Sequence, residues 1–191
     1  MKDFDDIQTL LKDDLAQTDA LLHSRLSSNV ALINQVSSYI ISAGGKRLRP
    51  LLLLLCARAT HYQGEHHRLM AVVIELIHTA TLLHDDIVDE SSTRRGKNTA
   101  NEVWGNAASV LVGDFLYSRS FEMMVEPGSM KIMQILSKAT NEIAQGEVLQ
   151  LLNCKNSALR QAEYYQVIER KTAILFQAAT QIGGILSKVN N

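Results

Sequence analysis

Proline is almost absent from this chain, and that scarcity is the feature that most constrains its fold. Only Pro50 and Pro127 occur among 191 residues. Proline inside a helix removes a backbone hydrogen bond and clashes with the preceding turn, so long helices can run unbroken between these two points. Apolar residues recur with the 3.6-residue period of a helix, and few segments alternate as strands do. We therefore predict an all-α bundle, with helices over residues 4–26, 30–42, 51–61, 67–90, 107–124, 130–152 and 163–186.

Local signals mark the ends of several predicted helices. The Gly44-Gly45 pair fits the end of the second helix, because glycine readily adopts the left-handed conformation that follows helix termini. Pro50 fits the first turn of the third helix, where its missing amide is not needed. Ser129 is expected to cap the long helix that follows it. Neither a repeat nor a linker interrupts the pattern, so residues 1–191 are expected to form a single helical domain.

The composition is that of an ordinary globular protein, with 46% apolar and 20% charged residues. The net charge of −1 creates no bulk field that would attract nucleic acid or a membrane surface, so an anion site must come from local clusters. The longest apolar run, residues 51–57, is far shorter than the roughly 20 residues that span a bilayer. Residues 1–19 are acidic and amphipathic, unlike a signal peptide. We therefore expect a cytoplasmic protein.

The chain has two cysteines, Cys56 and Cys154, and each falls in an apolar stretch with helical periodicity. Neither belongs to a Cys-x-x-Cys pair. We interpret both as buried thiols in a reducing compartment rather than as a disulfide or a metal pair.

Three aspartates, Asp85, Asp86 and Asp89, lie near the end of the most periodic predicted helix. Residues four apart lie about 40° from each other around a helix, so Asp85 and Asp89 share one face with Asp86 beside them. Clustered carboxylates repel one another, and oxygen ligands favour a hard ion such as Mg²⁺, which completes its shell with water and substrate phosphate. The acids alone would equally fit a solvated helix end. Their apolar flanks, and a helix C-terminus that disfavours negative charge, indicate a functional site.

Two basic clusters precede and follow the acids. Residues 44–50 read GGKRLRP, which places Lys46, Arg47 and Arg49 beside flexible glycines. Backbone amides and guanidinium groups of this kind suit a diphosphate. The second cluster, residues 94–97, follows a short polar linker and is placed to fold back over a metal-bound phosphate. Each cluster taken alone is also compatible with a solvated surface.

Polar residues of three predicted helices are candidates for the same cavity. His78 lies two helical turns before the aspartates, on a similar face of the same predicted helix. Lys171 and Thr172 offer a cation and a hydroxyl group. Glu147 and Gln150 are one turn apart in an otherwise apolar pattern. The structural alternative for each is a core histidine, a solvated cation or a satisfied polar network.

Six motifs of this sequence, in order, resemble those of the trans-polyprenyl diphosphate synthases, and in particular the octaprenyl diphosphate synthases of bacteria. The likeness covers roughly residues 27–186. Each motif is weak to moderate alone, whereas the ordered set is highly specific. The motifs are GGKRLRP, ELIHTATLLHDDIVD, RRGK, NAASVLVGDFLYSRSF, GEVLQL and KTA. The resemblance implies an isoprenoid-synthase-type helical bundle and a magnesium-dependent prenyltransferase.

The resemblance also implies a role for each candidate residue. In that family the first aspartate-rich motif holds Mg²⁺ ions that bridge to the allylic diphosphate, so the expected ligands are Asp85 and Asp89, with Asp86 oriented beside them. Contacts to isopentenyl diphosphate are expected from Lys46, Arg49, His78 and Arg95. Contacts to the allylic diphosphate, such as farnesyl diphosphate, are expected from Arg94 and Lys171. The nascent carbocation is expected to face Thr172 and Gln150.

The implied product is a long polyprenyl diphosphate of octaprenyl length, a precursor of quinone side chains. Ala80 and Thr81 lie one turn before Asp85, and both are small enough for a growing apolar tail to pass. A bulky aromatic residue there would stop the tail early. The deeper floor of this chain-length pocket is expected to contain Met123, Met124 and Leu136.

Family members carry a second aspartate-rich motif, and this sequence has no Asp-Asp-x-x-Asp after Asp114. We therefore expect the chain to correspond to a truncated bundle with little or no synthase activity alone. Apolar surface left open would favour a homodimer. The alternative function is a non-catalytic or heteromeric partner subunit of a prenyl synthase.

A metal phosphohydrolase of the HD type is a more distant alternative. His84-Asp85 is an HD pair, and such all-α enzymes bind a metal through a set of histidines. The preceding histidines are His61, His66, His67 and His78. This alternative leaves Asp86, Asp89 and the basic clusters unexplained.

Overall fold

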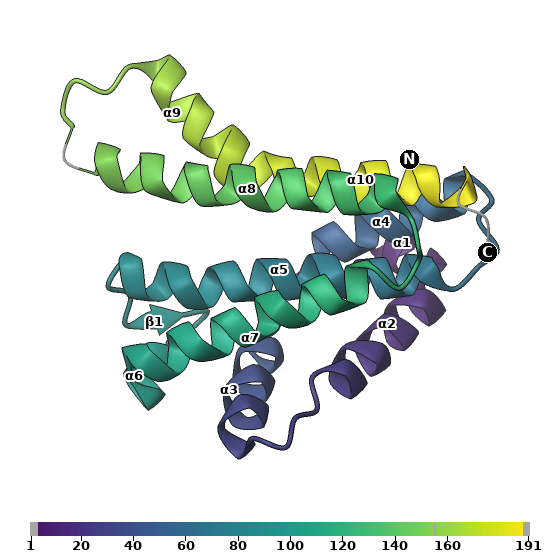
Figure 1. Ribbon diagram of the computed structural model, residues 1–191, viewed down its shortest axis with the longest axis horizontal. Helices are drawn as coiled ribbons and strands as arrows, with labels where there is room; N and C mark the ends of the chain where they lie inside the picture. Colours follow the sequence, from purple (N-terminus) through teal and green to yellow (C-terminus); the bar gives the residue numbers. More distant parts are fainter. Residues whose placement is uncertain (1–3, 155, 189–191) are drawn as a thin grey trace.

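The computed structural model describes residues 4–154 and 156–188, and most of them lie in helices, which confirms the predicted all-α class (Figure 1). The α-helices are α1 (Phe4–Leu10), α2 (Lys12–Arg25), α3 (Ala31–Ser42), α4 (Leu48–Ala59), α5 (His66–Val88), α6 (Ala100–Trp104), α7 (Asn106–Met124), α8 (Met130–Asn153), α9 (Gln161–Ile168) and α10 (Ile174–Ile185). The remaining elements are the π-helical turn η1 (Glu169–Ala173), the 3₁₀ turn η2 (Leu186–Lys188), and the antiparallel strands β1 (Thr93–Arg94) and β2 (Lys97–Asn98).

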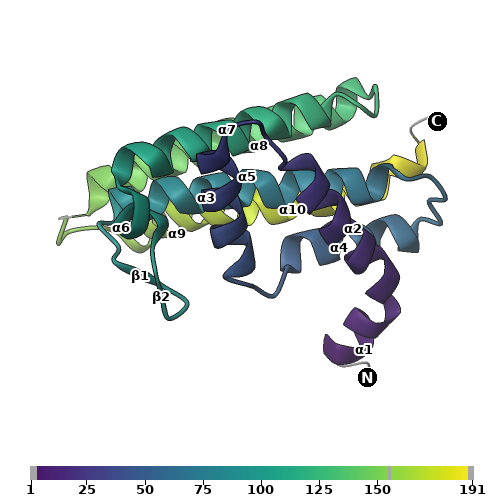
Figure 2. The ribbon, with the colours of Figure 1, turned by 90° about the horizontal axis from the view of Figure 1, so that it is seen from below.

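Helix α5 is the central element of the bundle. It packs against α2, α4 and α7, while α10 packs against α4 and α8. Figures 1 and 2 show the β1–β2 hairpin and α6 at the end of α5 that carries the aspartates, and α1 and α2 at the other end. Between Leu69 and Ile77, every residue of α5 except Glu75 is buried, as expected of a helix enclosed on all sides.

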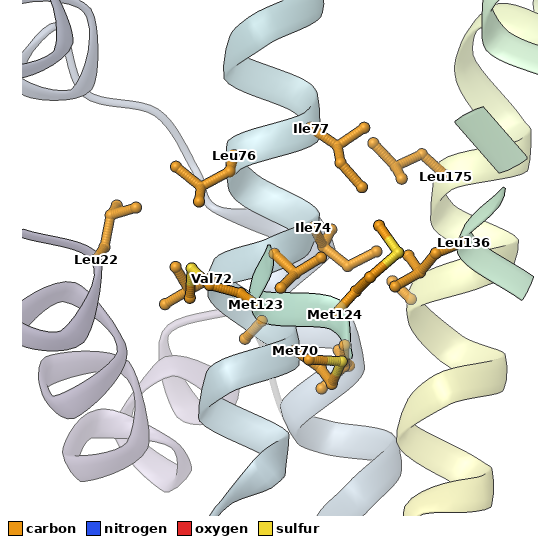
Figure 3. Close-up of a cluster of buried hydrophobic side chains, with 14 of the residues drawn as sticks. Leu22, Met70, Val72, Ile74, Leu76, Ile77, Met123, Met124, Leu136 and Leu175 are labelled. Atoms are coloured by element: carbon orange, nitrogen blue, oxygen red, sulfur yellow. The ribbon is translucent and has the colours of Figure 1, made fainter. Parts of the chain in front are cut away.

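The core is a contiguous cluster of aliphatic side chains and methionines. Figure 3 shows side chains of several helices that contribute to it, including Leu22 of α2, Met70, Ile74 and Ile77 of α5, Met123 and Met124 of α7, Leu136 of α8 and Leu175 of α10. Full burial of one such side chain stabilises the fold by about 1.5–3 kcal/mol. None of the helices in the described part of the chain is long and apolar enough to cross a membrane.

The residues predicted to mark helix ends lie at or near helix ends in the structure. The hydroxyl of Ser129 accepts a hydrogen bond from the amide of Ile132 at 3.4 Å, so Ser129 caps α8 as predicted. Pro50 lies in the first turn of α4, which begins two residues earlier at Leu48. Gly44 has a φ of +77°, a conformation that glycine adopts without strain, in the connection after α3.

Several element boundaries differ from those predicted. The helix predicted over residues 4–26 breaks at Leu11, and beside the break the guanidinium of Arg58 donates a hydrogen bond to the carbonyl oxygen of Leu10. Residues 93–98 form a hairpin that the sequence pattern did not predict, and α6 precedes the predicted start of α7. The last predicted helix begins earlier and contains η1.

The prediction that both thiols are buried is wrong for Cys154. Cys56 is partly buried, whereas Cys154 is exposed, and neither forms a disulfide. The last turn of α8 extends beyond the helices against which α8 packs, so that Leu151 and Leu152 next to Cys154 are also exposed, at 59% and 73%. Apolar periodicity predicted the helix correctly but did not show how far its packing partners reach.

Candidate active site

The three aspartates at the end of α5 divide into two kinds. Asp86 is only 2% exposed and accepts hydrogen bonds from Arg94, from Nε at 2.9 and 3.1 Å and from Nη2 at 2.7 Å. Asp85 is partly buried, and Asp89 is exposed at the C-terminal cap of α5. The carboxylates of Asp85 and Asp89 are therefore accessible to a ligand, whereas the carboxylate of Asp86 is occupied by an arginine.

Arg94 belongs to the short hairpin, whose turn residues Arg95 and Gly96 have φ values of +52° and +77°. Positive φ at both turn positions is typical of the tightest two-residue hairpins. The hydrogen bonds with Asp86 raise the pKa of Arg94 above its ordinary value, so the guanidinium keeps its charge. Asp86 thus anchors the second basic cluster over the end of α5.

His78 lies where the two basic clusters converge. Burial and then the charges of Arg49, Arg95, Arg94 and Arg47 lower the pKa of His78 to about 3. The imidazole is therefore neutral at pH 7 and can donate one hydrogen bond without adding a further charge. Four guanidinium groups therefore act on one neutral ring, although two of them, those of Arg94 and Arg47, are also paired with Asp86 and Glu75.

Close approach of the clusters requires a glycine in the first one. A Cβ atom at Gly45 would lie 2.8 Å from Nη1 of Arg95, and the φ of Gly45 is +154°. Any side chain there would push Arg95 away. The GGKRLRP segment and the RRGK hairpin, far apart in the sequence, therefore form one cationic surface.

Arg49 is the member of that surface that has a hydrogen-bond donor without an acceptor. Its Nε atom is buried without a hydrogen-bond partner, and its guanidinium carbon lies 4.4 Å from the ring centre of Phe176. Burial lowers the pKa of Arg49, although Glu75 opposes that shift. A buried donor without an acceptor indicates a ligand that supplies one. Its neighbour Arg47 instead pairs with Glu75 at 2.5 Å and therefore serves the fold.

Lys171 lies near the acids, on the segment that packs against α8. It lies on η1, and single π-helical turns inside α-helices are frequent at functional sites. Its ammonium nitrogen lies 2.7 Å from Oε2 of Glu147 and 3.3 Å from Oδ1 of Asp85. Burial opposes the charge of Lys171, but Glu147 and Asp85 outweigh it and raise its pKa. Burial and the nearby Asp85 raise the pKa of Glu147 despite the ammonium.

A cavity of about 270 Å³ opens beside this ion cluster, between α5, α7 and α8. Its lining residues are Thr81, His84, Asp85, Asp114, Tyr117, Ile143, Ala144 and Glu147. The lining is mainly apolar away from the acids, so the cavity suits a hydrocarbon group joined to an anionic head.

The residues predicted to set product length lie in two places, some at the cavity and some in the packed core. Thr81 lines the cavity, while Ala80 is fully buried beside it. Met123, Met124 and Leu136 are packed in the core cluster of Figure 3, at 1%, 4% and 0% exposure. Side chains fill that region, and these three residues do not line the cavity. Their role in setting product length stays a prediction.

The remaining predicted contacts surround the acids. The amide nitrogen of Gln150 lies 3.4 Å from Oδ1 of Asp89, which brings the end of α8 to the acidic turn. Thr172 is exposed on η1 next to Lys171, and Lys46 is exposed beside the glycine pair. The structure thus gathers Gln150 with the acids but leaves Lys46 and Thr172 at the surface.

The sequence analysis did not identify Asp114 and Tyr117 as residues that line the cavity. It considered His84 only as part of an HD pair and not as a residue of this cavity. His84 lies 3.4 Å from Asp114 across α5 and α7. The available signal was Gly113, because a Cβ there would clash with the imidazole of His84. A glycine inside a long helix indicates such a close approach.

The histidines of the phosphohydrolase alternative are not gathered in the structure. His67 pairs with Asp14 at the start of α5, His78 lies among arginines, and His84 lies near Asp114. Within residues 4–154 and 156–188, no three His, Cys, Asp or Glu side chains are grouped so as to hold a metal ion. A transition-metal centre of the HD kind therefore has no support here.

Comparisons with known proteins agree with this geometry. The chain is 52% identical over 181 residues to octaprenyl diphosphate synthase of Escherichia coli, which covers 95% of this chain and 56% of that protein. A decaprenyl diphosphate synthase structure from Rhodobacter capsulatus matches with a TM-score of 0.94 at 50% identity, over 97% of this chain and 57% of that one. A polyprenyl synthase from Caulobacter crescentus, complexed with calcium and isoprenyl diphosphate, matches with a TM-score of 0.93 at 47% identity, over 96% and 56%.

These relatives also set the extent of the match. The chain spans about half the length of the curated relatives it matches, for example 56% of the octaprenyl diphosphate synthase of Escherichia coli. The polyprenyl synthetase family model matches residues 30–191, which include both basic clusters, the aspartates and the lysine of η1. On the strength of that match and of the relatives' identity, the chain belongs to the polyprenyl synthetase family.

Proposed function

We propose that this chain contributes to a prenyltransferase that condenses isopentenyl diphosphate with an allylic diphosphate into a polyprenyl diphosphate of octaprenyl length. The observation that carries the proposal is the convergence of two basic clusters on neutral His78, within reach of the acidic turn. A site with separate cationic and acidic halves can hold two diphosphates, one directly and one through a divalent cation.

The cationic half is the proposed site for isopentenyl diphosphate. Arg49 has a buried donor without an acceptor, and Arg95 lies against Gly45 beside it. Neutral His78 would donate a hydrogen bond, and Lys46 would close over the phosphate from the exposed loop. Guanidinium groups bind phosphate oxygens in pairs, which makes them suited to holding a diphosphate in one orientation.

The acidic half is the proposed site for the allylic diphosphate. Asp85 and Asp89 would hold Mg²⁺, and their oxygen-only donor set fits that ion. Because no trio of ligating side chains gathers in the described part of the chain, the ion would need phosphate oxygens and further ligands as well. When bound, Mg²⁺ would add positive charge next to the leaving diphosphate.

The proposed chemistry needs no protein nucleophile. Lys171 and Arg94 would neutralise the departing diphosphate as the allylic carbon–oxygen bond breaks. Thr172 and Gln150 would face the cation, and the double bond of isopentenyl diphosphate, held close by the cationic half, would attack it. Loss of a proton would then restore an alkene. The cavity beside Thr81 and Tyr117 would accept the apolar tail.

A homodimer is part of this proposal. Helix α7 exposes large apolar side chains on its outer side, and exposed patches of this kind mark interaction surfaces. The residues are Val110, Leu111 and Phe121 of α7 and Val125, which follows its last turn. Sedimentation or light scattering of the purified chain would test it, and a monomer at all concentrations would contradict it.

The decisive experiment is a calorimetric titration of the chain with farnesyl diphosphate, with and without Mg²⁺. We expect Mg²⁺-dependent binding that Asp85→Asn abolishes and that Glu90→Gln, a change to an exposed acid nearby, leaves intact. Diphosphate binding that is indifferent to both Mg²⁺ and Asp85 would refute the proposal. We expect little condensation by the 191-residue chain alone, because the metal site needs further ligands.

A partner-subunit role is the second candidate. One relative, 36% identical over 93% of this chain, is named heptaprenyl diphosphate synthase component 2. Mixing the chain with a full-length polyprenyl synthase and measuring product length separates the two functions. A partner subunit changes the product distribution, whereas an independent site does not.

A further inference from the structure

Glu147 has no role in the chemistry proposed above, yet it lies at the centre of the site's ion pairs. Its Oε2 atom lies 2.7 Å from the ammonium nitrogen of Lys171, and its Oε1 atom is buried without a hydrogen-bond partner. A carboxylate that is partly desolvated and only half satisfied is costly for a fold. Its presence beside Lys171 calls for a functional reason.

The backbone fixes Glu147 and Lys171 to each other more firmly than either is fixed to Asp85. Helix α8 touches η1 at Gly146, where a Cβ atom would lie only 2.8 Å from the backbone nitrogen of Lys171. Asp85 belongs to α5, which packs mainly against α7, α4 and α2 rather than against α8 or η1. The ammonium of Lys171 accordingly lies nearer to Glu147, at 2.7 Å, than to Asp85, at 3.3 Å.

We infer that Glu147 is a positioning residue, which takes the shorter ion pair with Lys171, weakens the pairing of the ammonium with Asp85 and so keeps Asp85 available to a divalent cation. This inference rests on the proposed function. An ammonium paired with Asp85 alone would compete with the cation for the same oxygens. Glu147 supplies a second carboxylate, so the ammonium shares its donors between two acids. A lysine ammonium has three donors, which leaves one for a phosphate oxygen.

Removal of the charge on Glu147 tests this arrangement. In Glu147→Gln, Asp85 becomes the remaining carboxylate within reach of Lys171, and the two pair more tightly. We expect the Mg²⁺ concentration for half-saturation, measured by calorimetry in the presence of inorganic pyrophosphate, to rise on the order of 10-fold, a typical effect for a residue that supports a metal ligand. Glu147→Asp keeps the charge and is expected to restore most of the affinity.

Glu142→Gln is the matched control. Glu142 lies on the same helix and pairs with Arg170 of η1 at 3.5 Å, so the change loosens the same helix contact without involving Asp85. We expect unchanged Mg²⁺ affinity. An equal rise in this control would show a general disturbance of the α8–η1 contact and overturn the inference.

A double substitution shows whether Glu147 acts through Lys171. With Lys171→Met as background, Glu147→Gln should raise the Mg²⁺ requirement no further, because the competing ammonium is gone. Circular dichroism would establish that each variant keeps its helices. A full rise in the Lys171→Met background, or none in the single variant, would overturn the inference while leaving the proposed function standing. Wild-type chain without Mg²⁺-dependent pyrophosphate binding would overturn both.

Discussion

The two ends of α5 carry charged clusters that differ in how completely their members are paired. At the start, Asp14 of α2 accepts from His67 at 3.2 Å and from Arg68 at 2.9 and 3.0 Å. At the other end, buried Arg49 has a free donor and Glu147 a free acceptor. We call the first group the closed cluster because Asp14 joins both cations, although Nδ1 of His67 is also buried without a partner. In the second group, the unpaired atoms belong to the charged side chains themselves.

The pKa shifts of Asp14, Glu147 and His78 differ in a related way. Burial opposes the charge of Asp14, but His67 and Arg68 outweigh it and lower its pKa, as in a satisfied ion pair. Burial and the nearby Asp85 raise the pKa of Glu147, and burial and the surrounding arginines lower the pKa of His78 to about 3, so the surroundings of each group oppose its charge. Perturbations that disfavour charge are typical of sites that await a ligand. The contrast separates stabilising charge from functional charge on one helix.

Asp86 breaks this simple division, because it lies at the functional end but is fully paired. We expect Asp86→Ala to lower the free energy of unfolding by about 3 kcal/mol, since removing one partner of a buried ion pair leaves the other uncompensated. Chemical denaturation would measure this. Asp89→Ala, at the exposed end of the same turn, is the control and should change stability little. Equal effects would contradict the assignment of Asp86 to the fold.

Arg49 tests the opposite property, a group whose loss affects binding more than folding. We expect Arg49→Met to weaken isopentenyl diphosphate binding by roughly 10- to 100-fold, the range for loss of a charged hydrogen bond, and to leave stability nearly unchanged. Calorimetry and denaturation would give the two numbers. Arg68→Met, at the closed cluster, should do the reverse. A stability loss in Arg49→Met without a binding loss would place Arg49 in the structural class.

Asp14 measures the strength of the closed cluster. Asp14→Ala should lower the free energy of unfolding by about 1–2 kcal/mol at pH 7, because it removes charged hydrogen bonds. The folded-state pKa of Asp14 lies below its ordinary 3.8, so its stabilising effect is present above that pH and is lost as pH falls through the folded value. Urea unfolding at several pH values checks this, with exposed Asp13→Ala as control. A difference that persists in strong acid would disprove the pairing.

Ala80 and Thr81 allow a similar comparison beside the cavity proposed for the apolar tail, between a buried residue and one that lines the cavity. Ala80→Phe should destabilise the fold by about 1–3 kcal/mol because Ala80 is fully buried, whereas Thr81→Phe fills the adjoining cavity at smaller cost. In an active preparation, both should shorten the product, as read by chromatography. Unchanged product length from the double variant would exclude this route for the tail.

His78 carries the last prediction, which concerns the pH dependence of stability. Its pKa is about 3 in the folded chain against an ordinary 6.5, so between these values the unfolded state binds a proton that the folded state does not. Stability should therefore fall as pH drops from 6.5 towards 3, and His78→Gln should remove this slope. Exposed His23→Gln is the control. An identical slope in the His78 variant would show that the imidazole protonates freely when folded.

Much of this fold and part of the site were predictable from local pattern. Apolar periodicity predicts the long helices, Ser129 caps α8, and the spacing of Asp85 and Asp89 puts them on one face. The pattern could not show the break at Leu11, beside which Arg58, distant in sequence, donates to the carbonyl oxygen of Leu10. Nor could spacing show that Asp86 faces inward, since the helix position alone does not determine its partner.

The sequence by itself determined the helical class, the order of the motifs and the presence of residue types suited to phosphate and magnesium. Those properties depend on near neighbours along the chain, so they are legible without coordinates. Only the tertiary structure decided which charges are satisfied. It pairs Arg47 with Glu75 and Asp86 with Arg94, and it leaves Arg49 without an acceptor. Pairing depends on burial and on contacts between helices far apart in sequence, and these exist only once the chain has folded.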